Sequence, residues 1–193
     1  MKTARNIAII QGSIREGRLN DTITAWTRKQ LEAQGFTVSV VDPADPQLLP
    51  IQTGDTDAVA HLQTLLAPAD GYVVVTPEFN HSAPGQLKTL IDSIKAEWKA
   101  KPVGFVSYGG ISGGLRAVEA LRPVFAELHA MTLRDSVSFA MPWGKFDEQG
   151  QITDPQMRDG AEAAMAVFGD RLRWWVDALV AARAMEPYDK AAA

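Results

Sequence analysis

Five short apolar runs rich in β-branched residues recur along the 193-residue chain, with polar and amphipathic stretches between them. Continuous apolar runs are typical of strands that are covered on both faces, as in a parallel sheet. We therefore predict five buried strands, at residues 5–10, 36–41, 71–75, 102–107 and 133–139.

Helical periodicity fills the stretches between these runs. Leu87, Leu90 and Ile91, for example, stand three and four positions apart and share one face of a helix. Pro123 lies inside the fourth helical segment, where its ring should kink or divide the helix. The predicted helices cover residues 19–34, 56–67, 84–98, 114–130 and 155–184.

Strand and helix alternate strictly, and this alternation predicts the fold class. It is typical of a doubly wound α/β protein, a three-layer sandwich in which helices cover both faces of a parallel sheet through right-handed crossovers. For five strands we expect the flavodoxin-like order 2-1-3-4-5. The length suits one domain, so we expect a single domain over residues 1–193.

The fold also predicts where a ligand binds. In such sheets the ligand lies beyond the carboxyl ends of the strands, where the strand order reverses beside strands one and three. Three loops reach that place, residues 11–20, 76–84 and 108–114, and all three have an unusual composition. They are the candidate site.

The first loop combines glycines, arginines, Ser13 and Asn20 just before a predicted helix. Guanidinium groups, hydroxyls and a helix N-terminus all favour phosphate. The G-x-G-x-x-G dinucleotide fingerprint is not met, and Arg18 and Leu19 stand where a P-loop has its lysine and hydroxyl. We interpret the loop as a site for one terminal phosphate without an obligatory metal. A solvated polar turn is the simpler alternative.

The second loop follows the third predicted strand, which ends at Thr76 and Pro77, and Pro84 then opens a helix. Proline is well tolerated in the first helical turn, where its missing N–H has no partner to lose. A loop this short has a fixed backbone, whose free N–H and C=O groups can read the edge of a flat heterocycle. An ordinary strand-to-helix joint would have a similar composition.

The third loop has four glycines within residues 109–114, which predicts a backbone laid close against something flat or anionic. It also contains G-x-S-x-G around Ser112, so a serine hydrolase is an alternative. That chemistry needs a downstream acid and histidine from separate strand ends. His129 follows Ser112, but Glu119 and Glu127 lie on the same predicted helix as His129. The hydrolase is therefore the least favoured interpretation.

Composition excludes several other classes of function. The formal net charge of −4 disfavours an electrostatic grip on nucleic acid or acidic membrane. Cysteine is absent, which excludes disulfides, iron–sulfur clusters, thiolate zinc sites and a cysteine nucleophile. His61 and His81 stand apart from other ligand types, so we expect no metal site. No stretch approaches the roughly 20 apolar residues of a membrane span, so we expect a cytoplasmic protein without a membrane or nucleic-acid partner.

Taken together, the three loops resemble a known family. The segments GSIREGRLN, TPEFNHSAPGQLKTLID and SYGGISGGLRAVEALRPVFAEL are similar to the corresponding segments of the NADPH-dependent FMN reductases, and the match runs in order over about residues 5–140. This family is flavodoxin-like and includes quinone reductases, azoreductases and chromate-reducing enzymes.

The resemblance implies FMN as cofactor and NADPH or NADH as co-substrate. Hydride would pass through bound FMN to a small-molecule electron acceptor in a ping-pong cycle, with no catalytic side chain because the flavin carries the chemistry. A flavodoxin-type electron carrier or flavin-binding module is the alternative. A homodimer or homotetramer is expected, and the loop 140–153 is placed to cover a neighbouring site.

The resemblance also implies the residues of the FMN site, in three groups. The phosphate would be held by Ser13, Arg15, Arg18 and Asn20. The isoalloxazine would be lined, largely through backbone groups, by Pro77, Glu78, Phe79, Asn80, His81 and Ser82. The ring or the ribityl chain would be flanked by Ser107, Tyr108, Gly109, Gly110 and Gly113.

Overall fold

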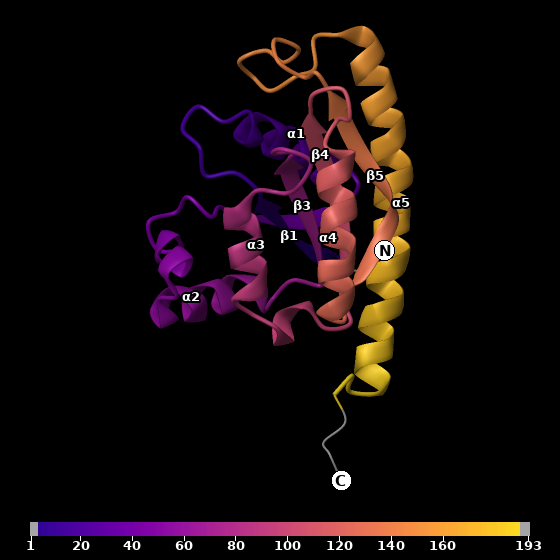
Figure 1. Cartoon of the computed structure of the whole chain (residues 1–193). Helices are drawn as coiled ribbons and strands as arrows, with labels where there is room; N and C mark the ends of the chain where they lie inside the picture. The colour runs from indigo at the N-terminus through magenta and orange to yellow at the C-terminus, as the bar shows by residue number, and fades with distance from the viewer. Residues whose placement is uncertain (1–3, 190–193) are drawn as a thin grey trace.

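Five parallel strands form one sheet in the order β2-β1-β3-β4-β5, which confirms the predicted topology (Figure 1). The computed structural model describes residues 4–189. Each predicted strand is present within a few residues of its predicted bounds. The strands are β1 (Arg5–Gln11), β2 (Phe36–Val41), β3 (Gly71–Pro77), β4 (Pro102–Gly109) and β5 (Met131–Ala140).

Helices cover both faces of the sheet, as Figure 1 shows. One hydrophobic cluster joins α1 and α5 to one face, and a second joins α2, α3 and α4 to the other. The helices are α1 (Asn20–Ala33), α2 (Thr56–Leu66), α3 (Gly85–Asp92), α4 (Leu115–Glu127) and α5 (Pro155–Met185), with short 3₁₀ turns η1 (Leu49–Thr53) and η2 (Ala96–Trp98).

The central strands are buried on both faces, as their apolar runs predicted. Alternate residues of β1 point to opposite faces, so Ile7 and Ile9 join one cluster while Ala8 and Ile10 join the other. These side chains are fully buried. Burial of the apolar runs on both faces therefore fixes the sheet in the middle of the sandwich.

Two helices differ from their predicted form. The predicted helix 84–98 ends at Asp92, and η2 follows, which places Trp98 in the core. There the Trp98 indole N–H donates to the Ile91 carbonyl at 3.1 Å, and its ring packs on Tyr72 with centroids 4.8 Å apart. The helix α4 runs through Pro123 without dividing, so of the two predicted effects of this proline only a kink stays a prediction.

The carboxyl ends of β1, β3 and β4 lie at the same edge of the sheet because these neighbouring strands are parallel. The three predicted loops therefore begin at that edge, as does the loop after β5, at the top in Figure 1. Within residues 4–189, no helix combines the length and apolarity that a bilayer crossing requires.

Candidate active site

The three loops meet around one pocket of about 210 Å³ at the carboxyl edge of the sheet. All three contribute to its wall, which is the convergence that the fold predicted. The wall includes these predicted site residues: Ser13, Arg15, Arg18, Pro77, Glu78, Phe79, Tyr108 and Gly109.

Asn20 holds the first loop against the sheet. Its side-chain oxygen accepts hydrogen bonds from the amides of Gly12 and Ser13 at 2.9 and 2.8 Å, and its amide nitrogen donates to the Val75 carbonyl at 3.0 Å. The residue is fully buried. Gly12 is needed because a Cβ there would lie 2.8 Å from the Thr76 hydroxyl. Asn20 thus shapes the loop, and its direct contact with phosphate stays a prediction.

The two arginines of the first loop are held differently. The Arg18 guanidinium donates to Asp21 at 2.8 Å, to Asp42 at 2.9 and 2.5 Å, and to the Ser13 carbonyl. Its side chain is only 9% exposed. Burial lowers the pKa of Arg18, but the two carboxylates outweigh burial and raise it. Arg18 therefore connects the first loop to the end of β2, and its charge is neutralised by the two carboxylates.

Arg15 lies on the exposed side of the same loop. Its guanidinium carbon stands 3.8 Å from the centroid of the Phe79 ring, a cation–π contact between the first and second loops. No carboxylate of residues 4–189 forms an ion pair with it. The positive charge of Arg15 is therefore available to a ligand in the pocket, whereas that of Arg18 is neutralised by Asp21 and Asp42.

The second loop closes in a tight two-residue turn. Phe79 and Ser82 exchange both backbone hydrogen bonds, at 2.9 and 3.1 Å. Between them Asn80 and His81 have φ of 49° and 70°, the pair of left-handed residues that defines a type I′ turn. Asn80, His81 and Ser82 lie outside the pocket wall. The turn shapes the loop and presents Phe79 to the pocket.

Glu78 ties the second loop to the third. Its carboxylate accepts hydrogen bonds from the Ser112 hydroxyl at 2.6 Å, and from the Arg116 guanidinium and amide at 2.7 and 3.1 Å. The side chain is only 7% exposed. Burial raises the pKa of Glu78, but the hydrogen bonds from Ser112 and Arg116 outweigh it and bring the pKa below its ordinary value. The carboxylate is therefore ionised and already fully occupied.

This arrangement does not form a serine hydrolase. Among the described residues the Ser112 hydroxyl bonds to Glu78 and to the Gly114 amide, not to a histidine. His129 follows the far end of α4, where its Nδ1 lies 2.8 Å from the Tyr188 hydroxyl. A helix of 13 residues is about 20 Å long, so Ser112 and His129 are far apart.

The glycines of the third loop serve its own packing. The hydroxyls of Ser107 and Ser138 both donate to the Gly113 carbonyl, at 2.9 and 2.8 Å. Gly113 has φ +61°, and a Cβ there would lie 2.3 Å from the Ser138 hydroxyl. Gly110 instead faces open space outside the pocket wall. Glycine is therefore required at position 113 by the packing against Ser138 and by the left-handed backbone, and not by close approach to a ligand.

Tyr108 forms the apolar side of the pocket with Phe79. Burial raises the pKa of Tyr108 above its ordinary value, so the phenol stays protonated at neutral pH. The residue is 5% exposed, and the neighbouring Gly109 forms part of the same wall. The pocket thus combines a cationic rim with aromatic and backbone walls, a combination that suits a planar ring with an anionic tail.

Four residues of the wall were not among the predicted site residues: Glu16, Gly17, Leu19 and Trp143. The first three stand beside predicted residues of the first loop. Trp143 belongs to the loop after β5, which we expected to cover a neighbouring site. In the structure this loop reaches the pocket of its own chain. The sequence signal that could have identified Trp143 is its place between Pro142 and Gly144, where a turn would present the side chain.

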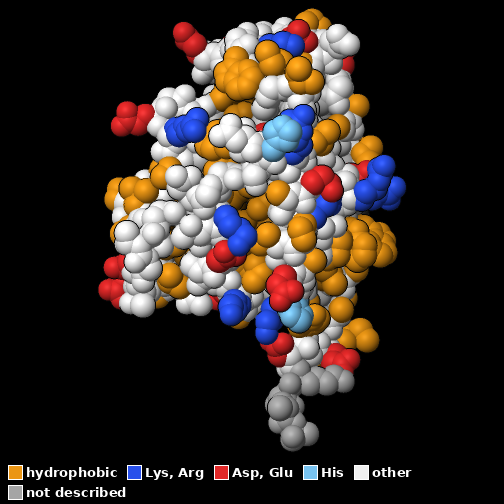
Figure 2. All heavy atoms as spheres, viewed as in Figure 1, with side chains coloured by type: hydrophobic (Ala, Val, Ile, Leu, Met, Phe, Trp, Pro, Cys, Tyr) orange, Lys and Arg blue, Asp and Glu red, His pale blue; other side chains and the backbone are white. Residues whose placement is uncertain are grey.

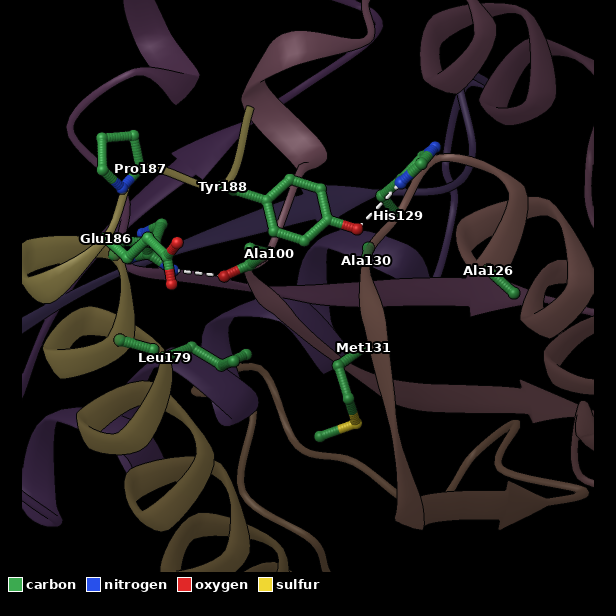
Figure 3. A pocket seen from close by; sticks show the side chains of 11 residues that line it. Ala100, Ala126, His129, Ala130, Met131, Leu179, Glu186, Pro187 and Tyr188 are labelled. Carbon is green, nitrogen blue, oxygen red and sulfur yellow. Dashed lines mark hydrogen bonds between the residues drawn. The ribbon is translucent and has the colours of Figure 1, made fainter. Parts of the chain in front are cut away.

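A larger cavity of about 600 Å³ lies at the opposite end of the sheet (Figure 3). It is bounded by the ends of α4 and α5 and the start of β5, and mostly alanine and other apolar side chains line it. In Figure 3 the Tyr188 hydroxyl points toward His129. None of the three loops reaches this cavity, so the smaller pocket at the strand ends is the candidate site.

The described residues contain no group of three or more histidines and carboxylates placed to hold a metal ion.

Comparison with known proteins decides the family. The model of the NADPH-dependent FMN reductases matches residues 5–144. The chain belongs to the NADPH-dependent FMN reductase family. The resemblance in the three loops is therefore confirmed, and with it the prediction of an oxidoreductase that uses FMN and a nicotinamide co-substrate.

Individual relatives agree with this family. An NAD(P)H-dependent FMN reductase of Schizosaccharomyces pombe is 36% identical over 59% of this chain and 62% of its own length. An NAD(P)H-dependent FMN reductase of Saccharomyces cerevisiae is 31% identical over 72% of this chain and 82% of its own. A probable NADPH:quinone oxidoreductase of Oryza sativa is 28% identical over 81% and 83%. The chain thus spans less than two thirds of the first of these.

Solved structures share the fold. The NAD(P)H:acceptor oxidoreductase FerB of Paracoccus denitrificans superposes with a TM-score of 0.72 over 91% of this chain and 98% of its own, at 21% identity. An archaeal flavodoxin superposes with a TM-score of 0.54 over 87% and 99%, at 12% identity. At such identities the likeness speaks for the flavodoxin-like fold alone.

Proposed function

We propose that this chain is an FMN-dependent NAD(P)H oxidoreductase that reduces a small acceptor such as a quinone. The observation that carries the proposal is the meeting of Arg15, which lacks an ion pair, with the aromatic wall of Phe79 and Tyr108 in one pocket. A flavin mononucleotide has the matching chemistry, a flat ring joined to a terminal phosphate.

The first loop fits the phosphate. Arg15 supplies an uncompensated charge, Ser13 supplies a hydroxyl, and the N-terminus of α1 begins at the adjacent Asn20. Arg18 is braced by Asp21 and Asp42, so we assign it a smaller share of the binding charge. Arg15 would therefore be the principal cationic ligand of the phosphate.

The second loop fits the edge of the ring. The amides of Glu78, Phe79 and Ser82 already donate to carbonyls of the chain. The amides of Asn80 and His81, at the centre of the type I′ turn, have no acceptor within residues 4–189. The two residues lie outside the pocket wall but directly after Phe79, so their amides are the donors left for the polar edge of a heterocycle that contacts Phe79 and Tyr108 and extends beyond the pocket.

Bound FMN would supply the hydride transfer. The nicotinamide and the acceptor would bind in turn at the open side of the pocket, which gives a ping-pong cycle. The net reaction takes a hydride from NAD(P)H and a proton from water, and converts a quinone to its hydroquinone. The Glu78 carboxylate is held by Ser112 and Arg116, so we propose no catalytic acid or base from the protein.

We also propose a homodimer or homotetramer. Ile111 and Leu115 are 94% and 49% exposed beside the candidate site, and apolar side chains this exposed favour burial against another subunit. Light scattering on the purified protein, with the I111D variant as comparison, would measure the mass and its dependence on this surface.

The test of the function begins with the purified protein. It should be yellow, and mass spectrometry should identify FMN after denaturation. Under anaerobic conditions NADPH should bleach the flavin absorbance, and 1,4-naphthoquinone should restore it. A flavodoxin-type carrier would bind FMN but would not be bleached by NADPH or NADH. A protein that takes up no FMN contradicts both functions.

A further inference from the structure

Trp143 joins the pocket wall from the loop after β5, outside the three loops that carry the family resemblance. The residue is 57% exposed, whereas Trp26 and Trp98 are buried in the core. In Figure 2 hydrophobic side chains lie together at the top of the view, the end of the molecule that carries the loop after β5. A partly solvent-exposed indole at the edge of a pocket is available for contact with a ligand.

A tight turn presents Trp143. The Lys145 amide donates to the Pro142 carbonyl at 3.1 Å, which places Trp143 and Gly144 at the two central positions. Gly144 has φ +73°, the left-handed value that the second central position of a type II turn requires. Trp143 therefore stands at the tip of a turn whose glycine fixes its backbone.

Contacts with the sheet and the core anchor this loop on both sides of the turn. The Met141 amide donates to the Gly109 carbonyl at 2.9 Å, so the loop begins beside the third loop of the site. The Phe146 ring packs on the buried Phe139 ring with centroids 5.7 Å apart, and Phe146 also pairs with Ile152 in an antiparallel bridge. These contacts hold the backbone on both sides of the turn that carries Trp143.

We propose that Trp143 determines acceptor specificity by stacking its indole on planar aromatic acceptors such as quinones. The inference rests on the proposed function. Trp143 shares the pocket wall with Phe79 and Tyr108, which we assigned to the flavin, so a flat acceptor that enters beside the bound flavin meets the exposed indole. A compact inorganic acceptor such as ferricyanide has no ring to stack, and Trp143 gives it no advantage.

The test compares the variants W143A and W143F with wild type in the FMN-loaded enzyme at saturating NADPH. W143A should raise the KM for 1,4-naphthoquinone roughly two- to tenfold, the size of one aromatic stacking interaction. It should leave the KM for ferricyanide within about twofold. W143F keeps an aromatic ring and should stay close to wild type for both acceptors. W174A removes a tryptophan that is 59% exposed on α5, outside the pocket wall, and serves as control.

A second readout does not depend on turnover. Titration of the oxidised holoprotein with 1,4-naphthoquinone, followed by the flavin absorbance, gives a dissociation constant that should weaken in W143A by the same factor as KM. FMN content should be unchanged.

Three results would overturn the inference. They are an unchanged naphthoquinone affinity in W143A, an equal rise in KM for naphthoquinone and ferricyanide, and loss of FMN from W143A, which would make Trp143 part of the cofactor site instead. Wild-type protein that oxidises NAD(P)H with neither acceptor would contradict the proposed function instead, and the equilibrium titration would still test the stacking.

Discussion

The Glu78 carboxylate accepts two hydrogen bonds from Arg116, one from the guanidinium at 2.7 Å and one from the backbone amide at 3.1 Å. The two residues are 38 positions apart, so this contact joins the second loop of the site to the N-terminus of α4. A carboxylate is well placed there because the helix dipole and the free amides of the first turn favour negative charge.

We expect Glu78→Gln to destabilise the protein by about 1–3 kcal/mol, because hydrogen bonds to a buried charge are lost or weakened. Urea unfolding measures this change. Glu119→Gln is the matched control, since Glu119 also pairs with an arginine, Arg122, but its side chain is 74% exposed. An exposed pair contributes roughly 0–1 kcal/mol. Equal effects of the two substitutions would contradict the structural role of Glu78.

The same carboxylate predicts a pH dependence. Its folded-state pKa lies below the ordinary value of 4.5, so the folded state favours the ionised form. The stability it contributes is present above pH 4.5 and is lost as the pH falls through the lower, folded-state pKa. Unfolding free energies of wild type and Glu78→Gln should therefore differ most at neutral pH and converge in acid. If the difference in unfolding free energy grew in acid instead, the folded-state pKa of Glu78 would lie above its ordinary value, contrary to the prediction.

Arg15→Ala should weaken FMN binding by roughly 10- to 100-fold, the size of lost charge-assisted hydrogen bonds to a phosphate. FMN titration of the apoprotein measures the affinity. The apo fold should keep its stability, because no carboxylate of the described chain pairs with Arg15. Arg28→Ala is the control, since Arg28 is an exposed arginine of α1 paired with Glu32.

Arg18 should behave in the opposite way. Arg18→Ala removes the partner of Asp42 and Asp21, so the apoprotein itself should lose about 1–3 kcal/mol of stability in urea. If Arg15→Ala lowers the stability of the apoprotein and Arg18→Ala does not, the two assignments are reversed.

Gly113→Ala should destabilise the fold by more than about 1 kcal/mol, because the new Cβ meets the Ser138 hydroxyl and the backbone has φ +61°. Gly110→Ala in the same loop should stay within about 0.5 kcal/mol, since its Cβ would meet open space and its φ is not left-handed. Thermal unfolding of the two variants under one set of conditions measures the contrast. Equal melting temperatures would show that the third loop is free to move at position 113.

Local patterns determined much of the fold. The apolar runs and the helical spacing between them predicted the five strands and their order, because alternating strands and helices allow few right-handed arrangements. The same topology predicted the edge where the three loops meet. Asn80 and His81 show the limit, since their residue types did not indicate a type I′ turn that leaves both amides free.

The amino-acid sequence by itself determined the family, the sheet and the edge that carries the site. Only the tertiary structure decided which residue does what there. Arg15 and Arg18 look alike in the sequence, but Asp42 at the end of the neighbouring strand β2 neutralises Arg18 alone. Ser112 has the sequence context of a nucleophile, but its hydroxyl donates to Glu78, and Trp143 lines the pocket from a loop whose Phe146 packs on Phe139. Each of these roles depends on a partner distant in the chain, which only the packing of the elements brings near.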